Sequence, residues 1–182
     1  MAAVAIEPHN PAWFTEFIRV KAELQAILGQ LPIDIEHVGS TSIPGLVAKP
    51  VLDIDIIVSP QNLSPVRDAL ASAGYEDLGT MNVPGRVAFR QPIESRAKEM
   101  RRNTYMVLEG CLSLRNHLDL KKVLLEDEAL RKEYGDVKRR LVNGGVRDVD
   151  EYCRGKNMIM LKILRKADWI EEDLEEVRKA NE

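Results

Sequence analysis

The spacing of apolar residues predicts a helix near the start of the chain and a strand on either side of a glycine-rich turn. The helical positions are Trp13, Phe17, Val20, Leu24 and Ile27. Short apolar runs at residues 33–38 and 51–58 have the length and composition of strands, and residues 63–73 return to helical spacing. The first part of the chain is therefore predicted to run helix, strand, turn, strand, helix.

The middle of the chain predicts two further strands, at residues 86–91 and 103–110, joined by a charged loop. Two strands with a loop of that size between them favour an antiparallel pair. From His117 onward the pattern is helical, and a last helix is predicted at about residues 150–167, before an acidic tail. The predicted fold class is α+β (mixed α/β): a small mixed β-sheet with flanking helices and a helical C-terminal third.

Length and composition fit one domain of residues 1–182, with a sheet-containing core at 1–116 and a helical part at 117–182. Apolar residues make up 45% of the chain, which is enough for a hydrophobic core. The formal net charge of −3 gives no global field that attracts nucleic acid or an anionic membrane. No apolar run approaches membrane-spanning length, and the cysteines, Cys111 and Cys153, are isolated. A cytoplasmic protein with two free thiols is expected.

The candidate chemistry lies in the stretch IEHVGSTSIPGLVAKPVLDID. In a strand, residues two apart point to the same face, so Asp53 and Asp55 would present both carboxylates together. Two hard oxygen ligands whose charges repel one another suit Mg²⁺. Upstream, Gly39 and Ser40 form a turn whose backbone N–H groups and hydroxyl suit a phosphate. The pattern thus predicts a phosphate turn beside a magnesium site.

Simpler interpretations of these residues remain open. Asp-x-Asp on a strand is often only a solvated face, although aspartate is a poor strand former and two of them in the most apolar strand favour a functional role. His37 could donate to a phosphate or act as a base, or it could hold a strand end through a hydrogen bond. A Ser–His–Asp hydrolase is rejected, because the Gly-x-Ser-x-Gly pattern is absent.

A Gly-Ser pair, a spacer of about twelve residues, and Asp-x-Asp on an apolar strand together resemble the signature of the nucleotidyltransferase superfamily that includes DNA polymerase beta. IEHVGSTSIPGLVAKPVLDIDIIV resembles the opening block of the GrpB-like family more closely. The resemblance continues through NPAWFTEF, RRNTYMVLEGCLSLRNHL and YCRGKNMIMLKILRKADW, and so covers nearly the whole chain. The chain is therefore identified from its sequence as a GrpB-like protein with an expected nucleotidyltransferase fold.

The resemblance implies site residues at matching positions. It implies phosphate binding by the residues of the turn and a lysine after it: Gly39, Ser40, Thr41, Ser42 and Lys49. It implies metal binding and catalysis by Asp53 and Asp55. The superfamily also places a third carboxylate on a neighbouring strand, where the sequence offers only Glu109. Lys156 lies in the C-terminal block of the resemblance and is expected to point back at the nucleotide and bind phosphate. Lys49 and Lys156 each have the alternative of a surface role.

Basic residues crowd residues 86–102, and Arg90 and Arg102 are the candidates to hold a triphosphate. The alternative for each is a solvated loop in which Glu94 and Glu99 are interspersed. Aromatic residues make up only 5% of the chain, which argues against a stacking platform for single-stranded RNA. Binding of transfer RNA through phosphates alone stays open.

Two functional hypotheses follow. The first is a cytoplasmic, Mg²⁺-dependent enzyme that transfers a nucleotidyl group from ATP or another nucleoside triphosphate to a small-molecule or carrier-borne acceptor. The second is a catalytically degenerate nucleotidyltransferase fold that serves as a nucleotide-binding or regulatory module linked to coenzyme A metabolism. The gap at the third carboxylate favours the second hypothesis, and the intact Gly-Ser and Asp-x-Asp patterns favour the first. The acceptor, the nucleotide and the oligomeric state are not specified by the sequence.

Overall fold

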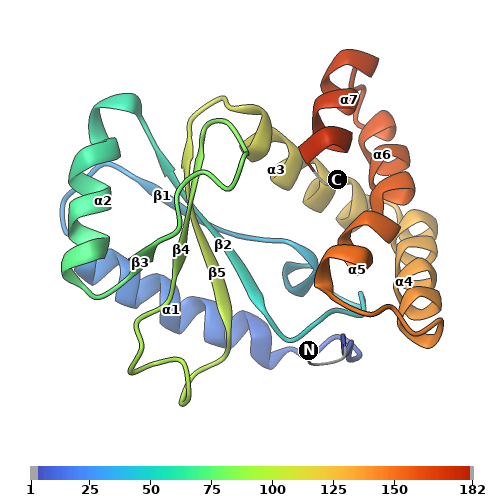
Figure 1. The fold of residues 1–182 in the computed structure, drawn as a ribbon, viewed down its shortest axis with the longest axis horizontal. Helices are drawn as coiled ribbons and strands as arrows, with labels where there is room; N and C mark the ends of the chain where they lie inside the picture. Colours follow the sequence, from blue (N-terminus) through green and yellow to red (C-terminus); the bar gives the residue numbers. More distant parts are fainter. Residues whose placement is uncertain (1–3, 181–182) are drawn as a thin grey trace.

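The computed structural model describes residues 4–180 and begins much as the apolar spacing predicts (Figure 1). The first elements are α1 (Ala12–Leu28), β1 (Asp34–Val38), a 3-10 turn (Ser40–Ser42), β2 (Leu52–Val58), a second 3-10 turn (Pro60–Asn62) and α2 (Leu63–Ser72). The helix–strand–turn–strand–helix order is confirmed. After the single 3-10 turn, the chain crosses to β2 without a further regular element.

The second half of the chain contains the remaining strands and a series of helices. They are β3 (Glu76–Asp77), β4 (Arg86–Arg90), β5 (Arg102–Leu108), α3 (Leu112–Glu126), α4 (Glu128–Asn143), α5 (Val149–Gly155), α6 (Asn157–Lys166) and α7 (Glu171–Ala180). The single helix predicted at 150–167 is wrong, because the chain changes direction at Lys156 and forms two helices, α5 and α6. The acidic tail continues as α7, which packs on α6 through Leu174 and Val177.

The strands form one mixed sheet in the order β1-β2-β5-β4-β3. β2 and β5 are parallel, and every other neighbouring pair is antiparallel, including the predicted β4–β5 pair. The parallel register sets Asp53 opposite Asn103 and Asp55 opposite Tyr105. This register decides which side chains of β5 can reach the two aspartates.

The two faces of the sheet have different partners. The even-numbered residues of β2 are all buried against α1 and α2, namely Leu52, Ile54, Ile56 and Val58. Helices α3 to α7 gather on the other side of the molecule, away from α1 and α2 (Figure 1). Burying one apolar face under two helices stabilises the sheet and leaves the face with the aspartates for the helical part to cover. The predicted fold class is confirmed.

None of the helices within residues 4–180 is both long and apolar enough to cross a lipid bilayer.

Candidate functional site

Asp53 and Asp55 share one face of β2, as their spacing predicts. Asp55 is completely buried, whereas Asp53 is partly exposed. Asp53 borders a cavity of about 750 Å³ between the sheet, α3 and the C-terminal helices. Burial raises the pKa of the Asp53 carboxyl, and the hydrogen bond from Asn103 opposes that rise. The sheet thus holds two carboxylates on one face, and burial makes the charge of Asp53 costly.

The turn after β1 packs directly on Asp53. Val38 pairs with Asp53 across the two strands, so the next residue, Gly39, approaches the carboxylate. Gly39 has a φ of 69°, and a Cβ at this position would overlap the Asp53 carboxylate. Glycine is therefore required here both for its backbone conformation and for the close approach. The structure therefore places the turn directly beside Asp53, as the sequence pattern predicts.

The four residues of the turn, 39–42, make different contacts. Gly39 and Ser40 border the cavity. Ser42 donates its hydroxyl hydrogen bond back to the Gly39 carbonyl at 2.7 Å. Thr41 is buried, and its hydroxyl lies 2.9 Å from Nε2 of His37. Only Gly39 and Ser40 are placed to meet a ligand in the cavity, whereas the Thr41 and Ser42 hydroxyls hold the turn together.

The surroundings of His37 indicate a structural role rather than a catalytic one. Its ring is 4% exposed and stacks on Phe17 of α1, with ring centroids 4.7 Å apart. Burial, helped by the charge of Lys121, lowers the pKa of His37 to about 4. The ring is therefore neutral at pH 7. Of the two interpretations open from the sequence, the structure favours a hydrogen bond that holds the strand end.

Each aspartate receives a hydrogen bond from a side chain that sequence patterns did not single out. Asn103 of β5 donates through Nδ2 to Asp53 Oδ1 at 2.8 Å. Nδ1 of His117, on α3, lies 2.7 Å from Asp55 Oδ2. The other oxygen of Asp55, Oδ1, is buried with no hydrogen-bond partner in the described structure. His117 comes from 62 residues further along the chain, so no local spacing could have linked it to Asp55.

A buried lysine of α4 supports the phosphate turn. Lys138 is 1% exposed and donates through Nζ to Ser40 Oγ at 2.5 Å and to the Val47 carbonyl at 2.9 Å. Burial, together with the nearby charge of Lys156, lowers the pKa of Lys138 well below its ordinary value. The sequence held a signal for this residue, because Lys138 continues the four-residue spacing of Leu130 and Tyr134 on the apolar face of α4.

Lys49 and Lys156, both predicted to bind phosphate, converge near the same place. Their Nζ atoms lie 5.4 Å and 4.6 Å from the centroid of the Tyr152 ring. Both charges act on Asp53, whose pKa they lower against the larger effect of burial. Lys156 also borders the cavity. The three lysines 49, 138 and 156 thus come from separate segments and meet beside the turn and Asp53, where the charges of Lys49 and Lys156 act on the Asp53 carboxyl.

The structure does not bring Glu109 to the aspartates. Glu109 is exposed just beyond the end of β5, where its backbone N–H bonds to the Val58 carbonyl. Because β2 and β5 are parallel, this position lies at the opposite end of the sheet from Asp53, about six residues or 20 Å along the strand. The predicted third carboxylate is therefore misplaced, and Asn103 occupies the position opposite Asp53.

Neither predicted arginine reaches the cavity. Arg102 pairs in register with Leu52 and so faces α1, where its buried guanidinium bonds to Glu23 and Glu99. Arg90 lies two strands away from Asp53 and forms an exposed ion pair with Glu76. The triphosphate role predicted for these two residues has no support in the geometry. The basic residue of β4 that does border the cavity is Arg86, whose guanidinium lies over the Tyr105 ring.

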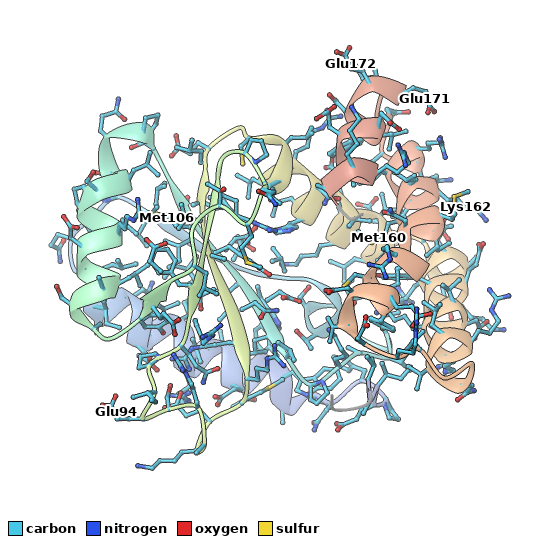
Figure 2. All side chains as sticks on the ribbon, in the orientation of Figure 1. Glu94, Met106, Met160, Lys162, Glu171 and Glu172 are labelled. Carbon is cyan, nitrogen blue, oxygen red and sulfur yellow. The ribbon has the colours of Figure 1, made fainter. Side chains whose placement is uncertain are left out.

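The cavity has a wall from the helical part as well as a floor from the sheet. Along α6, Met160 borders the cavity, whereas Lys162 points to the outside and forms an ion pair with Glu133 of α4 (Figure 2). Residues of α7, including Glu176 and Lys179, complete the wall. The cavity is thus enclosed by parts of the chain more than 140 residues apart.

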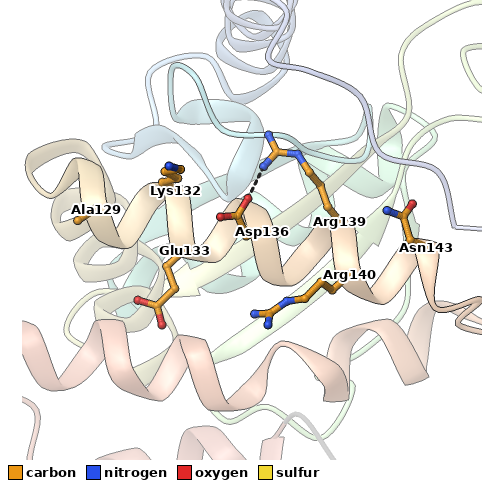
Figure 3. Close-up of a pocket in the computed structure, with 7 residues that line it drawn as sticks. All are labelled: Ala129, Lys132, Glu133, Asp136, Arg139, Arg140 and Asn143. Atoms are coloured by element: carbon orange, nitrogen blue, oxygen red, sulfur yellow. Dashed lines mark hydrogen bonds and ion pairs between the residues drawn. The ribbon is translucent and has the colours of Figure 1, made fainter.

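A second hollow lies on the outer face of α4 (Figure 3). It is lined by Ala129, Lys132, Glu133, Asp136, Arg139, Arg140 and Asn143, and within it Arg139 and Asp136 form an ion pair at 2.8 Å. None of the predicted site residues borders this hollow. The cavity beside Asp53, which several predicted site residues border, is therefore the better candidate.

The two aspartates fit a hard divalent cation. Asp55 Oδ1 is a buried carboxylate oxygen that lacks a donor, and a cation would satisfy it. Within residues 4–180 no three His, Cys, Asp or Glu side chains form a metal-binding group. The protein would therefore supply two carboxylates, which is the number that Mg²⁺ often takes from a protein when phosphates and water supply the rest.

One solved structure supports the fold. The crystal structure of the conserved protein GrpB from Enterococcus faecalis superposes with a TM-score of 0.75 at 25% identity, covering 91% of this chain and 100% of that one. The Cid1 poly(U) polymerase with MgGTP bound gives a TM-score of 0.46 at 14% identity over 74% of this chain and 46% of that one.

Comparison with known sequences identifies the family. UPF0157 protein BH1888 of Halalkalibacterium halodurans is 29% identical over 168 residues, which are 91% of this chain and 83% of that protein. A dephospho-CoA kinase of Mycolicibacterium paratuberculosis is 35% identical over 81 residues, which are 42% of this chain and 20% of that protein. The sequence model of the family described as GrpB protein matches residues 3–166. The chain therefore belongs to the GrpB family.

Proposed function

We propose that this chain binds a nucleoside triphosphate together with Mg²⁺ in the cavity beside Asp53 and acts as a nucleotidyltransferase. The observation that carries the proposal is the contact between the Gly39–Ser40 turn and Asp53, because it sets a phosphate-binding turn against a carboxylate that can hold the metal of the phosphate. Lys156 adds positive charge at the same place, and Lys138 donates a hydrogen bond to Ser40 of the turn.

Each group has a role in the proposed site. The Gly39–Ser40 turn would bind a phosphate through its N–H groups and hydroxyl, with Lys138 holding Ser40 in position. Asp53 and Asp55 would hold the Mg²⁺. The bound ion would neutralise charge on the phosphates and on the leaving pyrophosphate. Lys156 borders the cavity and would bind a terminal phosphate.

The proposed reaction is attack by an acceptor oxygen on the α-phosphorus. A new acceptor O–P bond forms, the bond from the α-phosphorus to the bridging oxygen breaks, and pyrophosphate leaves while the acceptor proton passes to water. The protein contributes orientation of the triphosphate and fixed positive charge, which are the main requirements of phosphoryl-type transfer. Small molecules, carrier-borne groups and transfer RNA are the acceptor classes to test.

A second candidate function is nucleotide binding without transfer. The observation that favours it is Asn103, an amide at the position opposite Asp53 where a third carboxylate would help to activate the acceptor. The match to a segment of a dephospho-CoA kinase suggests a regulatory role beside coenzyme A metabolism. Pyrophosphate release during incubation with ATP and the acceptor panel separates the candidates: release supports transfer, and binding without release supports a binding module.

Isothermal titration with the four nucleoside triphosphates, with and without Mg²⁺, tests the binding site that both candidates share. The expected result is saturable binding of at least one nucleotide that requires Mg²⁺ and is lost in Asp53→Asn/Asp55→Asn. A matched control is Glu171→Gln/Glu172→Gln, which removes the same charge from the exposed start of α7 (Figure 2), at two residues that do not line the cavity. No binding to the wild-type protein would overturn the proposal.

The aspartate variant should lose binding without losing its fold. Burial raises the pKa of the Asp53 carboxyl, so the ionised form is costly and the neutral amide relieves that cost. We expect the double asparagine variant to unfold at the same temperature as the wild type or at a higher one. Loss of binding together with a lowered unfolding temperature would mean that the aspartates act through the fold, contrary to the proposal.

A further inference from the structure

The two aspartates are held in the same way by donors from two different elements. Asn103 donates to Oδ1 of Asp53, and no described residue donates a hydrogen bond to its Oδ2. His117 bonds to Oδ2 of Asp55, and Oδ1 of that residue has no partner. Each carboxylate therefore has one oxygen that accepts a hydrogen bond from the protein and one oxygen without a donor among the described residues.

The identity of the donor atoms follows from the chemistry of the pairs. A carboxylate can only accept a hydrogen bond, so the proton of the Asp55–His117 bond lies on Nδ1 of the imidazole. The His117 ring is held on a second side by Tyr105, whose ring centroid lies 5.9 Å away, and it is 18% exposed toward the cavity that it borders. His117 is thus fixed rather than free to turn.

Asn103 is fixed by the sheet. The parallel register places it beside Asp53, and its amide N–H group points at the carboxylate. A carboxylate at this position could share a second cation with Asp53, as in two-metal sites. An amide nitrogen that donates to Asp53 cannot do so. The arrangement leaves two free carboxylate oxygens, one from each aspartate.

We propose that Asn103 and His117 are positioning residues that orient Asp53 and Asp55 for a single divalent cation. The inference rests on the proposed function and goes further than it, because it assigns two residues outside the Gly-Ser and Asp-x-Asp patterns and limits the site to one ion. Hydrogen bonds to metal-bound carboxylates typically change metal affinity by about 10- to 100-fold when they are removed.

Titration of the protein with Mn²⁺ alone tests the inference, with free Mn²⁺ measured by electron paramagnetic resonance. The wild type is expected to bind one ion. Asn103→Leu and His117→Leu each remove a donor and should weaken Mn²⁺ binding by about tenfold or more. His117→Asn has the shape of the leucine variant but keeps an N–H group where Nδ1 stood, so it should stay within about threefold of the wild type, a rescue that a purely structural role of the ring does not produce.

The outcomes separate this inference from the proposed function. A wild type that binds no Mn²⁺ overturns this inference, and the nucleotide titration described above then decides the proposed function separately. A wild type that binds two ions, or leucine variants that bind Mn²⁺ as tightly as the wild type or more tightly, overturn the positioning role and leave the nucleotide site standing. If His117→Leu does not fold, the comparison uses Asn103→Leu and His117→Asn. The inference is then overturned if Asn103→Leu binds Mn²⁺ as tightly as the wild type, or if His117→Asn loses tenfold or more in Mn²⁺ affinity.

Discussion

Replacing Gly39 with alanine should damage the fold and the site together, because the new methyl group would enter the space of Asp53. Gly39 has φ 69° and ψ −173°, a region that side chains rarely adopt, and occupying it costs about 1–3 kcal/mol. The added Cβ would overlap Asp53 Oδ2 and lie 2.9 Å from Asp53 Cβ. Overpacking of this kind costs about 1–3 kcal/mol more. The expected loss of unfolding free energy is therefore about 2–6 kcal/mol.

Gly45→Ala is the matched control for the contact. Gly45 also has a positive φ, of 80°, but a Cβ there has no atom within 4 Å. Its cost should be the backbone strain alone, so Gly39→Ala should unfold at a lower urea concentration than Gly45→Ala. Mn²⁺ and ATP binding should fall only in Gly39→Ala, because only that change displaces Asp53. Equal losses of stability in the two variants, with binding retained in both, would refute the close approach of the turn to the aspartate.

Three further predictions concern residues around the site. Burial lowers the pKa of His37 to about 4, so between pH 6.5 and 4 the unfolded chain binds a proton at this residue and the folded chain does not. As the pH is lowered through that window, the free energy of unfolding measured by urea denaturation should fall by about 3 kcal/mol. The fall should be smaller in His37→Phe, which has no titrating ring. Lys138→Met should weaken ATP binding about tenfold or more by calorimetry, since it removes the donor to Ser40, whereas Lys132→Met on the exposed side of the same helix should not. Glu109→Gln should leave Mn²⁺ and ATP binding unchanged, and a loss in that variant would contradict its place at the far end of the sheet.

The parts of the site that the sequence predicts are the ones set by local geometry. Asp53 and Asp55 share a face because strand side chains alternate, and the buried residues 52, 54, 56 and 58 of β2 share the opposite face by the same rule. The Gly39–Ser40 turn lies beside Asp53 because β1 and β2 are neighbouring antiparallel strands. Strands that follow one another along the chain are usually neighbours in the sheet, which is why this arrangement was predictable.

The parts that the sequence does not predict depend on register and on distant contacts. Arg102 and Asn103 are adjacent in the chain, so they must face opposite sides of β5, but only the β2–β5 register shows that Asn103 is the one facing Asp53. Glu109 follows the same strand yet lies at its other end. His117 reaches Asp55 only because α3 packs across the sheet. These relations arise from tertiary packing, which the spacing of residues along the chain does not encode.

The location of the proposed cation is the most direct test of the account. A crystal of the wild-type protein grown with Mn²⁺ and a non-hydrolysable ATP analogue would locate the ion by its anomalous scattering. The expected result is one ion bound by Asp53 and Asp55, with a phosphate of the analogue on the Gly39–Ser40 turn. An ion and nucleotide bound elsewhere, or an empty cavity under conditions that saturate binding in solution, would contradict it.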